Sequence, residues 1–388
     1  MRGGERALMY ALMVTPNAFP NGDAGAVRDY AFACIYEDLG FEVVHLGKGT
    51  VSQGLYRGIE YHSLYVEASS FAEKVRRRAN AFDVFKKTYE DVVAEHGLPS
   101  LIHIYDVDEK IFRFLVSLGQ QLSVPVLHDS VEWYSPCQFK VGKLDYRYVM
   151  KDRLNRSLVR KPVKVIAISE FLGTYFSDKG IKTTVVPVIM DSNDYEILPS
   201  RVASNKIRLM YAGSPAAKDY LSVCIRAFGN LPENIRERFQ LDVYGASDDD
   251  ISPLFDCGKL PAGIEAHGRV SRSEVLDALG GADFSLLLRP ENERYARAGF
   301  PTKVVEAMMC GCPMLCNLSS DLSNYLSDGV NSVVVNGHTE KDLYDSLIRI
   351  SEMPRKQIEG MRAAARRDAE RYFDYRNYRD AVDHLIHE

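Results

Sequence analysis

Residues 299–316 read GFPTKVVEAMMCGCPMLC, and this stretch contains a helix, a stop and a strand. Pro301 suits the first turn of a helix that runs to about residue 310, and Gly311 suits its C-terminal stop. The apolar run 313–316 then predicts a buried strand. Glu306 interrupts the apolar face of the helix, and a carboxylate in such surroundings needs hydrogen-bond donors.

The same alternation of short β-rich runs and helix-compatible stretches continues in both directions. Most runs are continuously apolar, which is typical of parallel strands buried on both faces. We therefore predict an α/β fold of two Rossmann-like, doubly wound domains, 1–195 and 205–373, facing across a cleft. A polar segment including Pro199 forms the linker. The predicted strands are 8–14, 42–46, 101–105, 125–128, 163–168, 184–188, 207–212, 239–244, 264–266, 283–288, 313–316 and 332–335.

Composition narrows the function classes. The chain has 388 residues, 46% hydrophobic and 26% charged, with a net charge of −5, which gives no sign of nucleic-acid binding. No apolar run approaches a membrane span. Residues 8–14 lead into a turn, which suits a first strand better than a cleaved signal. Seven cysteines make an odd number for a disulfide framework, so we expect a reducing cytoplasm.

Two loops of the first half carry candidate ligand groups. In 16–30, Gly22 and Gly25 let the backbone approach a ligand, and Arg28 near a helix N-terminus (27–39) favours an anion. The alternative is a glycine turn with a solvated arginine.

The second loop, 125–134, brings His128, Asp129 and Glu132 together before Trp133. Acidic groups at a strand end can polarise a hydroxyl, and aromatic rings stack on sugars. Alternatively, Asp129 caps a helix and His128 is half-buried in the sheet.

Two loops of the second half contain groups that could bind a diphosphate. In 211–220, Gly213 and Lys218 combine backbone N–H groups, a helix dipole and one ammonium group. In 299–310, the free N–H groups of the helix's first turn face the end of the preceding strand. Glu306 then has two candidate partners, Lys303 at i−3 or a pair of ribose hydroxyls.

Together these loops resemble the retaining glycosyltransferases of the GT-B fold, family 4 (group 1), of the type that builds cell-surface polysaccharides. The donor-binding half is carried by YAGS…K at 211–218, HGRVSRSEV at 267–275 and GFPTKVVEAMMCGCPM at 299–314. The acceptor half is carried by DSVEWY at 129–134. In the family a C-terminal helix crosses back to the first domain, which here implies about 375–388.

The resemblance implies a metal-independent hexosyltransferase without a cofactor. Its donor is a UDP- or GDP-linked sugar, and its acceptor is a hydroxyl of a glycan or a lipid-linked glycan. Glu306 falls on the ribose-binding glutamate and Lys218 on the diphosphate lysine. The implied donor-binding residues are Gly25, Gly213, Ser214, Lys218, Arg269, Arg289, Gly299, Phe300, Pro301, Thr302 and Glu306, and the catalytic candidates are Glu132, His128 and Lys218.

The sequence departs from the family pattern at two positions. Ala298 stands where a glutamate is usual, eight positions before Glu306. Either Glu291 or Glu293 compensates, or the backbone suffices. Val131 stands where many relatives carry a histidine, and a shifted alignment uses His128 instead.

A basic segment, 145–164, predicts an amphipathic helix with Met150, Leu154 and Leu158 on its apolar face. It either contacts anionic lipid at the inner face of the membrane or is a packed helix with a solvated charged face. Its basic residues are Arg147, Lys151, Arg153, Arg156, Arg160, Lys161 and Lys164.

Two other functions remain open, and a metal site at the cysteines of the 299–316 stretch also has to be considered. The same fold suits a nucleotide-sugar epimerase or hydrolase, and it suits a non-catalytic partner of another glycosyltransferase. Neither half has the GxGxxG turn of a nicotinamide dehydrogenase. Cys310, Cys312 and Cys316 have no nearby histidine before His338, so we interpret them as packing residues and expect no metal site there.

Overall fold

The structure is a computed structural model that describes residues 9–20, 24–49, 51–65, 71–195, 206–213, 219–255 and 258–388, with backbone only for 71–79. The chain forms two compact α/β units, Met1–Met190 with Tyr375–Glu388, and Asp191–Asp374. The first unit therefore ends at Met190, whereas the sequence analysis placed its boundary at residue 195.

The first unit is built on an eight-stranded sheet in the order β3-β4-β2-β1-β5-β6-β7-β8. The central strand β1 is buried on both faces over Tyr10–Val14, because helices cover both sides of the sheet. Its strands are β1 (Tyr10–Ala18), β2 (Glu42–Lys48), β3 (Gln53–Tyr56), β4 (Ile59–Tyr65), β5 (Leu101–Ile104), β6 (Val126–Ser130), β7 (Lys164–Ala167) and β8 (Thr183–Val185). Its helices are α1 (Ala24–Asp38), α2 (Phe71–His96), α3 (Glu109–Leu122), α4 (Tyr146–Arg153), α5 (Glu170–Asp178) and α14 (Arg379–His387).

The hairpin β3–β4 was missed by the sequence analysis. β3 pairs antiparallel with β4, whereas the other strand pairs of this sheet are parallel. The turn uses Arg57 and Gly58, with φ of 48° and 93°. A two-residue Arg-Gly turn between Tyr56 and Ile59, which pair across it, is a hairpin signal that a search for continuous apolar runs overlooks.

The second unit contains a six-stranded parallel sheet in the order β11-β10-β9-β12-β13-β14. Leu209, Phe239 and Phe284 are fully buried in its core. Its strands are β9 (Ile207–Ala212), β10 (Phe239–Tyr244), β11 (Ile264–Gly268), β12 (Phe284–Leu287), β13 (Met314–Cys316) and β14 (Ser332–Val334). Its helices are α6 (Leu221–Gly229), α7 (Glu233–Arg236), α8 (Asp248–Ile251), α9 (Arg272–Gly281), α10 (Arg294–Ala298), α11 (Thr302–Met309), α12 (Glu340–Ser351) and α13 (Arg355–Phe373).

The basic segment 145–164 is not one helix, contrary to the sequence prediction. α4 ends at Arg153, a π-helical turn follows over Leu154–Leu158, and β7 begins at Lys164. Lys151 is buried against Asp106 at 2.8 Å, and Arg153 and Arg156 pair with acidic neighbours. Much of the expected cationic face is therefore used within the protein.

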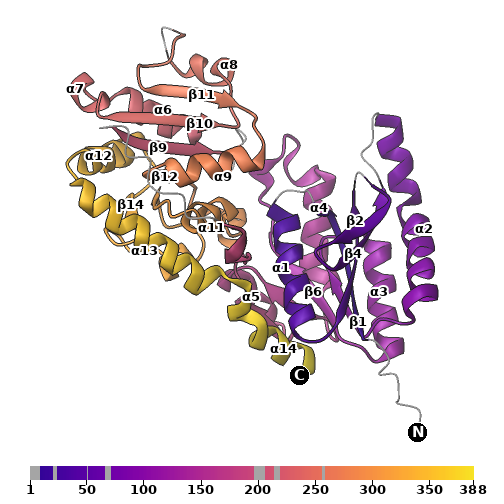
Figure 1. Ribbon diagram of the computed structural model, residues 1–388. Coiled ribbons are helices and arrows are strands. Elements are labelled where there is room, and N and C mark those ends of the chain that lie inside the picture. Colours follow the sequence, from indigo (N-terminus) through magenta and orange to yellow (C-terminus); the bar gives the residue numbers. More distant parts are fainter. Residues whose placement is uncertain are drawn as a thin grey trace. The chain divides into compact units, whose positions relative to one another are not determined.

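The last helix, α14, packs within the first unit. Figure 1 shows it in yellow beside α1, although the two are at opposite ends of the sequence. The backbone N–H of Tyr375 donates to the Met190 carbonyl at 3.0 Å. Lys164 Nζ donates to the carbonyls of Leu385 and Ile386 at 2.8 Å each and so caps the C-terminus of α14. In the described part of the chain, no helix has the length and apolar character needed to span a membrane.

Candidate functional site

A cluster of charges lies at the carboxyl end of the second sheet. Asp219, only 8% exposed, accepts hydrogen bonds from Arg289 Nε at 2.8 Å and from Lys303 Nζ. Burial alone would raise the pKa of Asp219, but the charges of Lys303 and Arg289 outweigh it and hold the pKa below its ordinary value. Two cations therefore share one carboxylate, and the cluster carries an excess of positive charge.

Lys303 was the partner that the sequence analysis considered for Glu306, and this was wrong. It lies in the first turn of α11 and reaches across to Asp219 and the end of β9. Gly213 follows β9 with φ of 154°, and a Cβ there would come within 2.5 Å of Lys303 Nζ. Glycine at this position thus admits both the backbone conformation and the lysine.

The N-terminus of α11 has no side-chain cap. Pro301 is the N-cap residue and makes no side-chain hydrogen bond. The Val304 N–H donates to the Pro301 carbonyl at 3.0 Å, which leaves the N–H groups of Thr302 and Lys303 without an intrahelical acceptor. Phe300 is 6% exposed, and its ring packs on Tyr325 and Phe373. Its side chain is therefore structural, and at Phe300, Pro301 and the half-buried Gly299 the ligand group on offer is the backbone.

Glu306 is held by an arginine from the 267–275 motif. Arg272 donates to Glu306 Oε1 through Nε at 3.0 Å and Nη2 at 2.8 Å, and Nη2 also donates to the Tyr195 hydroxyl at 2.8 Å. Oε2 of Glu306 makes no hydrogen bond within the described residues, and the side chain is 18% exposed. One carboxylate oxygen is thus fixed and the other is available.

The remaining donor-side candidates fall in different places. Arg289 lies at the Asp219 cluster, and Asn317 fixes its backbone through bonds of 2.9 and 2.7 Å. Arg269 is exposed after β11, and its charge acts on Asp250. Ser214 and Lys218 lie outside the described residues.

In the first unit, Arg28 is not available to an anion, contrary to the sequence hypothesis. Its Nε and Nη2 donate to the two carboxylate oxygens of Asp129 at 2.7 and 2.8 Å, and the side chains are 6% and 1% exposed. Nη2 also donates to the Val186 carbonyl at 3.1 Å, and Nη1 to that of Pro187. Asp129 is therefore the counter-ion of Arg28 rather than a helix cap.

Gly25 faces the side chain of Asn17. A Cβ at Gly25 would lie 2.3 Å from Asn17 Oδ1, while Asn17 Nδ2 donates to Asp29 at 2.9 Å. The glycine lets the start of α1 approach this hydrogen-bonded side chain closely. The structure therefore gives Gly25 a packing reason that is independent of any ligand.

Two acidic groups follow the neighbouring strands β5 and β6, and the sequence analysis named only one of them. Glu132 follows β6 and accepts a 2.5 Å hydrogen bond from the Tyr134 hydroxyl. Asp106 follows β5 with φ of 43°, and the charge of Lys151 holds its pKa below the ordinary value despite burial. Burial, and next the charges of Glu132 and Asp106, raise the pKa of Tyr105. A polar residue directly after a buried strand was the signal that would have identified Asp106.

His128 and Trp133 are less accessible than the sequence suggested. His128 lies within β6, is fully buried and packs edge-on against Phe112. Burial, and next the charge of Lys151, lower its pKa to about 3, so it is neutral. Trp133 is 3% exposed and donates to Asp152 at 2.9 Å, so its ring is part of the core and does not stack on a sugar.

The cysteines of the 299–316 stretch are packed in the second unit. α11 ends before Cys310, and Gly311 takes a left-handed conformation with φ of 68°. Burial raises the pKa of Cys310 and Cys316 to about 12, and that of Cys312 further, so the three remain protonated thiols. A protonated, buried thiol is a packing group.

Comparison with known proteins agrees with the geometry of the second unit. Residues 196–368 match the family described as glycosyl transferases group 1. The second unit is a group 1 glycosyl transferase domain. An uncharacterized glycosyltransferase of Methanocaldococcus jannaschii is 21% identical over 238 residues, which span 59% of this chain and 59% of that protein.

Solved structures show that the whole chain has the GT-B fold. WaaG, a glycosyltransferase involved in lipopolysaccharide biosynthesis, superposes with a TM-score of 0.69 at 14% identity, covering 97% of this chain and 100% of that one. HepE of Anabaena, solved with UDP and glucose, gives a TM-score of 0.69 at 16% identity, covering 98% and 100%. The glycosyl transferase domain is thus accompanied by a second Rossmann-like unit, as in those proteins.

Proposed function

We propose that this protein transfers a hexosyl group from a UDP- or GDP-linked sugar to a hydroxyl of a glycan or lipid-linked acceptor, with retention of configuration. The observation that carries the proposal is the Asp219–Lys303–Arg289 cluster beside the uncapped N-terminus of α11. An excess of positive charge and free N–H groups at the carboxyl end of a parallel sheet suit a diphosphate.

In this proposal the cluster does the work that a metal does in other transferases. Arg289, Lys303 and the dipole of α11 neutralise the charge that grows on the leaving diphosphate. Lys218, which lies outside the described residues, stays a candidate from the family resemblance alone. Asp219 keeps the two described cations in place between turnovers, and no metal ion is needed for transfer.

Glu306 positions the donor. Because Arg272 occupies Oε1, Oε2 accepts from ribose hydroxyls. Ala298 is fully buried and provides no acceptor, so hydroxyl groups of the sugar are recognised by other residues, with the backbone at Gly299 and Phe300 as candidates.

On the acceptor unit, Glu132 and Asp106 are the candidates for orienting the incoming hydroxyl. Glu132 is the catalytic candidate from the sequence analysis. Asp106 is added because both residues follow the ends of neighbouring strands. His128 drops out of the proposal because its ring is enclosed in the sheet. Lys151 is buried and paired with Asp106, so it holds that carboxylate in place rather than contacting the acceptor.

The test uses Glu306→Gln with Glu340→Gln as a matched control, because Glu340 also pairs with an arginine, Arg226, at 3.2 Å on an exposed surface. A thermal-shift screen of UDP, GDP, ADP and their sugars first identifies the nucleotide. Glu306→Gln then weakens binding by about 1–3 kcal/mol, or roughly 5- to 150-fold, whereas the control leaves it unchanged. Unchanged affinity of Glu306→Gln for every nucleotide defeats this role.

The reaction itself separates the alternatives. The protein is incubated with the donor and acceptor glycans in the presence of EDTA, and NMR determines the anomeric configuration of the product. We expect transfer with retention of the donor's anomeric configuration. Epimer formation or stoichiometric hydrolysis from donor alone supports the epimerase or hydrolase instead. Nucleotide binding without any turnover supports a non-catalytic partner.

Peripheral membrane contact belongs to the same proposal. Val141, Leu144, Tyr146 and Val149 are exposed, Leu144 to 85%, around the basic Arg147 and the start of α4. Such an apolar and basic surface suits anionic lipid at the cytoplasmic face, where lipid-linked acceptors of polysaccharide assembly are found. Flotation with anionic liposomes tests it, and Leu144→Glu abolishes recovery. Equal recovery with neutral liposomes, or none with either, contradicts it.

A further inference from the structure

A group of side chains of the types that bind metal ions lies at the amino ends of the strands β2 and β4 in the first sheet. Glu60 is near the start of β4 and Glu42 begins β2, its parallel neighbour. Glu95 and His96 are the last two residues of α2. The proposed sugar loops follow the carboxyl ends of strands, so this group at the amino ends is separate from them.

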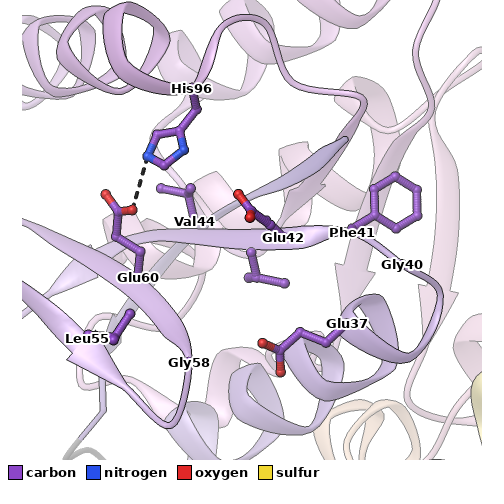
Figure 2. A pocket seen from close by; sticks show the side chains of 10 residues that line it. Glu37, Gly40, Phe41, Glu42, Val44, Leu55, Gly58, Glu60 and His96 are labelled. Carbon is purple, nitrogen blue, oxygen red and sulfur yellow. Dashed lines mark ion pairs between the residues drawn. The ribbon is translucent and has the colours of Figure 1, made fainter. Parts of the chain in front are cut away.

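The Glu60 carboxylate lies between two imidazoles. Its Oε1 is 2.5 Å from His62 Nε2, and its Oε2 is 3.0 Å from His96 Nε2, the pair joined by the dashed line in Figure 2. One ligand atom each from Glu60, Glu95 and His96 lies within 4.8 Å of the others. Two ligands of a tetrahedral zinc ion, each about 2.0–2.1 Å from it, are roughly 3.3 Å apart, which falls within this range.

The His96 ring is held in place, and its ligand atom lacks a hydrogen bond. Nε2 is shielded from solvent and, within the described residues, forms no hydrogen bond despite its approach to Glu60. The Tyr10 ring packs on the imidazole at 5.7 Å between centroids, and the Tyr10 hydroxyl donates to the Gly97 carbonyl at 3.1 Å. A fixed imidazole nitrogen facing a carboxylate without a hydrogen bond is the arrangement of two ligands around one cation.

An acidic cavity of about 550 Å³ adjoins these residues (Figure 2). Glu37 and Glu42 line it together with Glu60 and His96, and none of the described residues lining it is a lysine or arginine. Carboxylates gathered without a cation repel one another. A bound divalent ion offsets that repulsion.

We propose that Glu60, Glu95 and His96 bind one zinc ion, with His62 orienting Glu60. Mixed imidazole and carboxylate ligands suit zinc better than Mg²⁺ or Ca²⁺, which prefer oxygen alone. His62 donates to the carboxylate oxygen that faces away from His96, as the outer partners of metal ligands do. The ion ties the end of α2 to the edge hairpin and takes no part in sugar transfer.

The experiment measures zinc binding by the full chain, without an affinity tag and after chelator treatment. Titration calorimetry and metal analysis after dialysis give one zinc ion for the wild type, and zinc raises the Tm. His96→Gln abolishes binding. Glu95→Gln, at an exposed position that tolerates substitution, weakens it at least ~10-fold, and His62→Phe weakens it by about 10- to 100-fold.

Two controls distinguish this site from incidental zinc binding. His267→Ala removes the histidine of another acidic group, in which Asp242 already pairs with Arg208. His384→Ala with His387→Ala removes exposed surface histidines. Both leave zinc binding unchanged. The proposal is overturned if the folded wild type retains no zinc, if Glu95→Gln and His96→Gln bind as tightly as the wild type, or if only the controls lose the ion.

Discussion

The buried pair of Arg28 and Asp129 provides the sharpest prediction about stability. It joins α1 to β6, and Arg28 also bonds to the carbonyls of Val186 and Pro187. Because the two side chains are 6% and 1% exposed, solvent and salt screen the interaction only weakly. Replacing one partner leaves a buried charge uncompensated, which costs about 3–5 kcal/mol.

The perturbation is a double-mutant cycle of Arg28→Met, Asp129→Leu and the pair. Each single variant destabilises the first unit by about 3–5 kcal/mol, or roughly 6–20 °C in Tm at about 2–4 °C per kcal/mol. The double variant removes both charges, so its loss is smaller than the sum by about 2–3 kcal/mol. The two carbonyls left unpaired keep it below the wild type.

The assay is calorimetry with hydrogen exchange of the α1 and β6 amides, because a chain of two units need not unfold in one step. Arg226→Met is the matched control, since its pair with Glu340 is 45% and 39% exposed and contributes less than about 1 kcal/mol. Additive single effects, or a Tm change as small as that of the control, would refute the reasoning. Under the proposed function, nucleotide binding is assigned to the second unit and is therefore unaffected in every case.

Two further predictions concern the second unit and the thiols. Asp219→Asn destabilises the second unit by about 3 kcal/mol at pH 7, because two cations lose their counter-ion. Since the folded pKa of Asp219 is lowered, this contribution is present above about pH 4 and is lost as the pH falls through the folded value. Tm curves of variant and wild type therefore converge in acid, and a constant gap would contradict the pairing. Separately, iodoacetamide labels the exposed Cys137 in the native protein, whereas Cys312 stays unlabelled until unfolding because burial raises its pKa. Mass spectrometry reads both sites, and equal labelling rates would contradict the packing role of Cys312.

The sequence by itself determined the class of fold and the backbone elements around the second-unit loops. Continuous apolar runs and the Pro301–Gly311 punctuation are local signals, so α11 and β13 were predictable within a few residues. β3 and β4 were missed because their strands are half-exposed and lack a continuous apolar run.

Only the tertiary structure decided which charges meet. Lys303 reaches Asp219 across 84 positions, Arg272 reaches Glu306 across 34, and Arg28 reaches Asp129 across 101. At such separations no helical or strand period relates the partners. The sequence marked Glu306 as a carboxylate that needs donors. That its donor is Arg272 follows from how the helices of the second unit pack together.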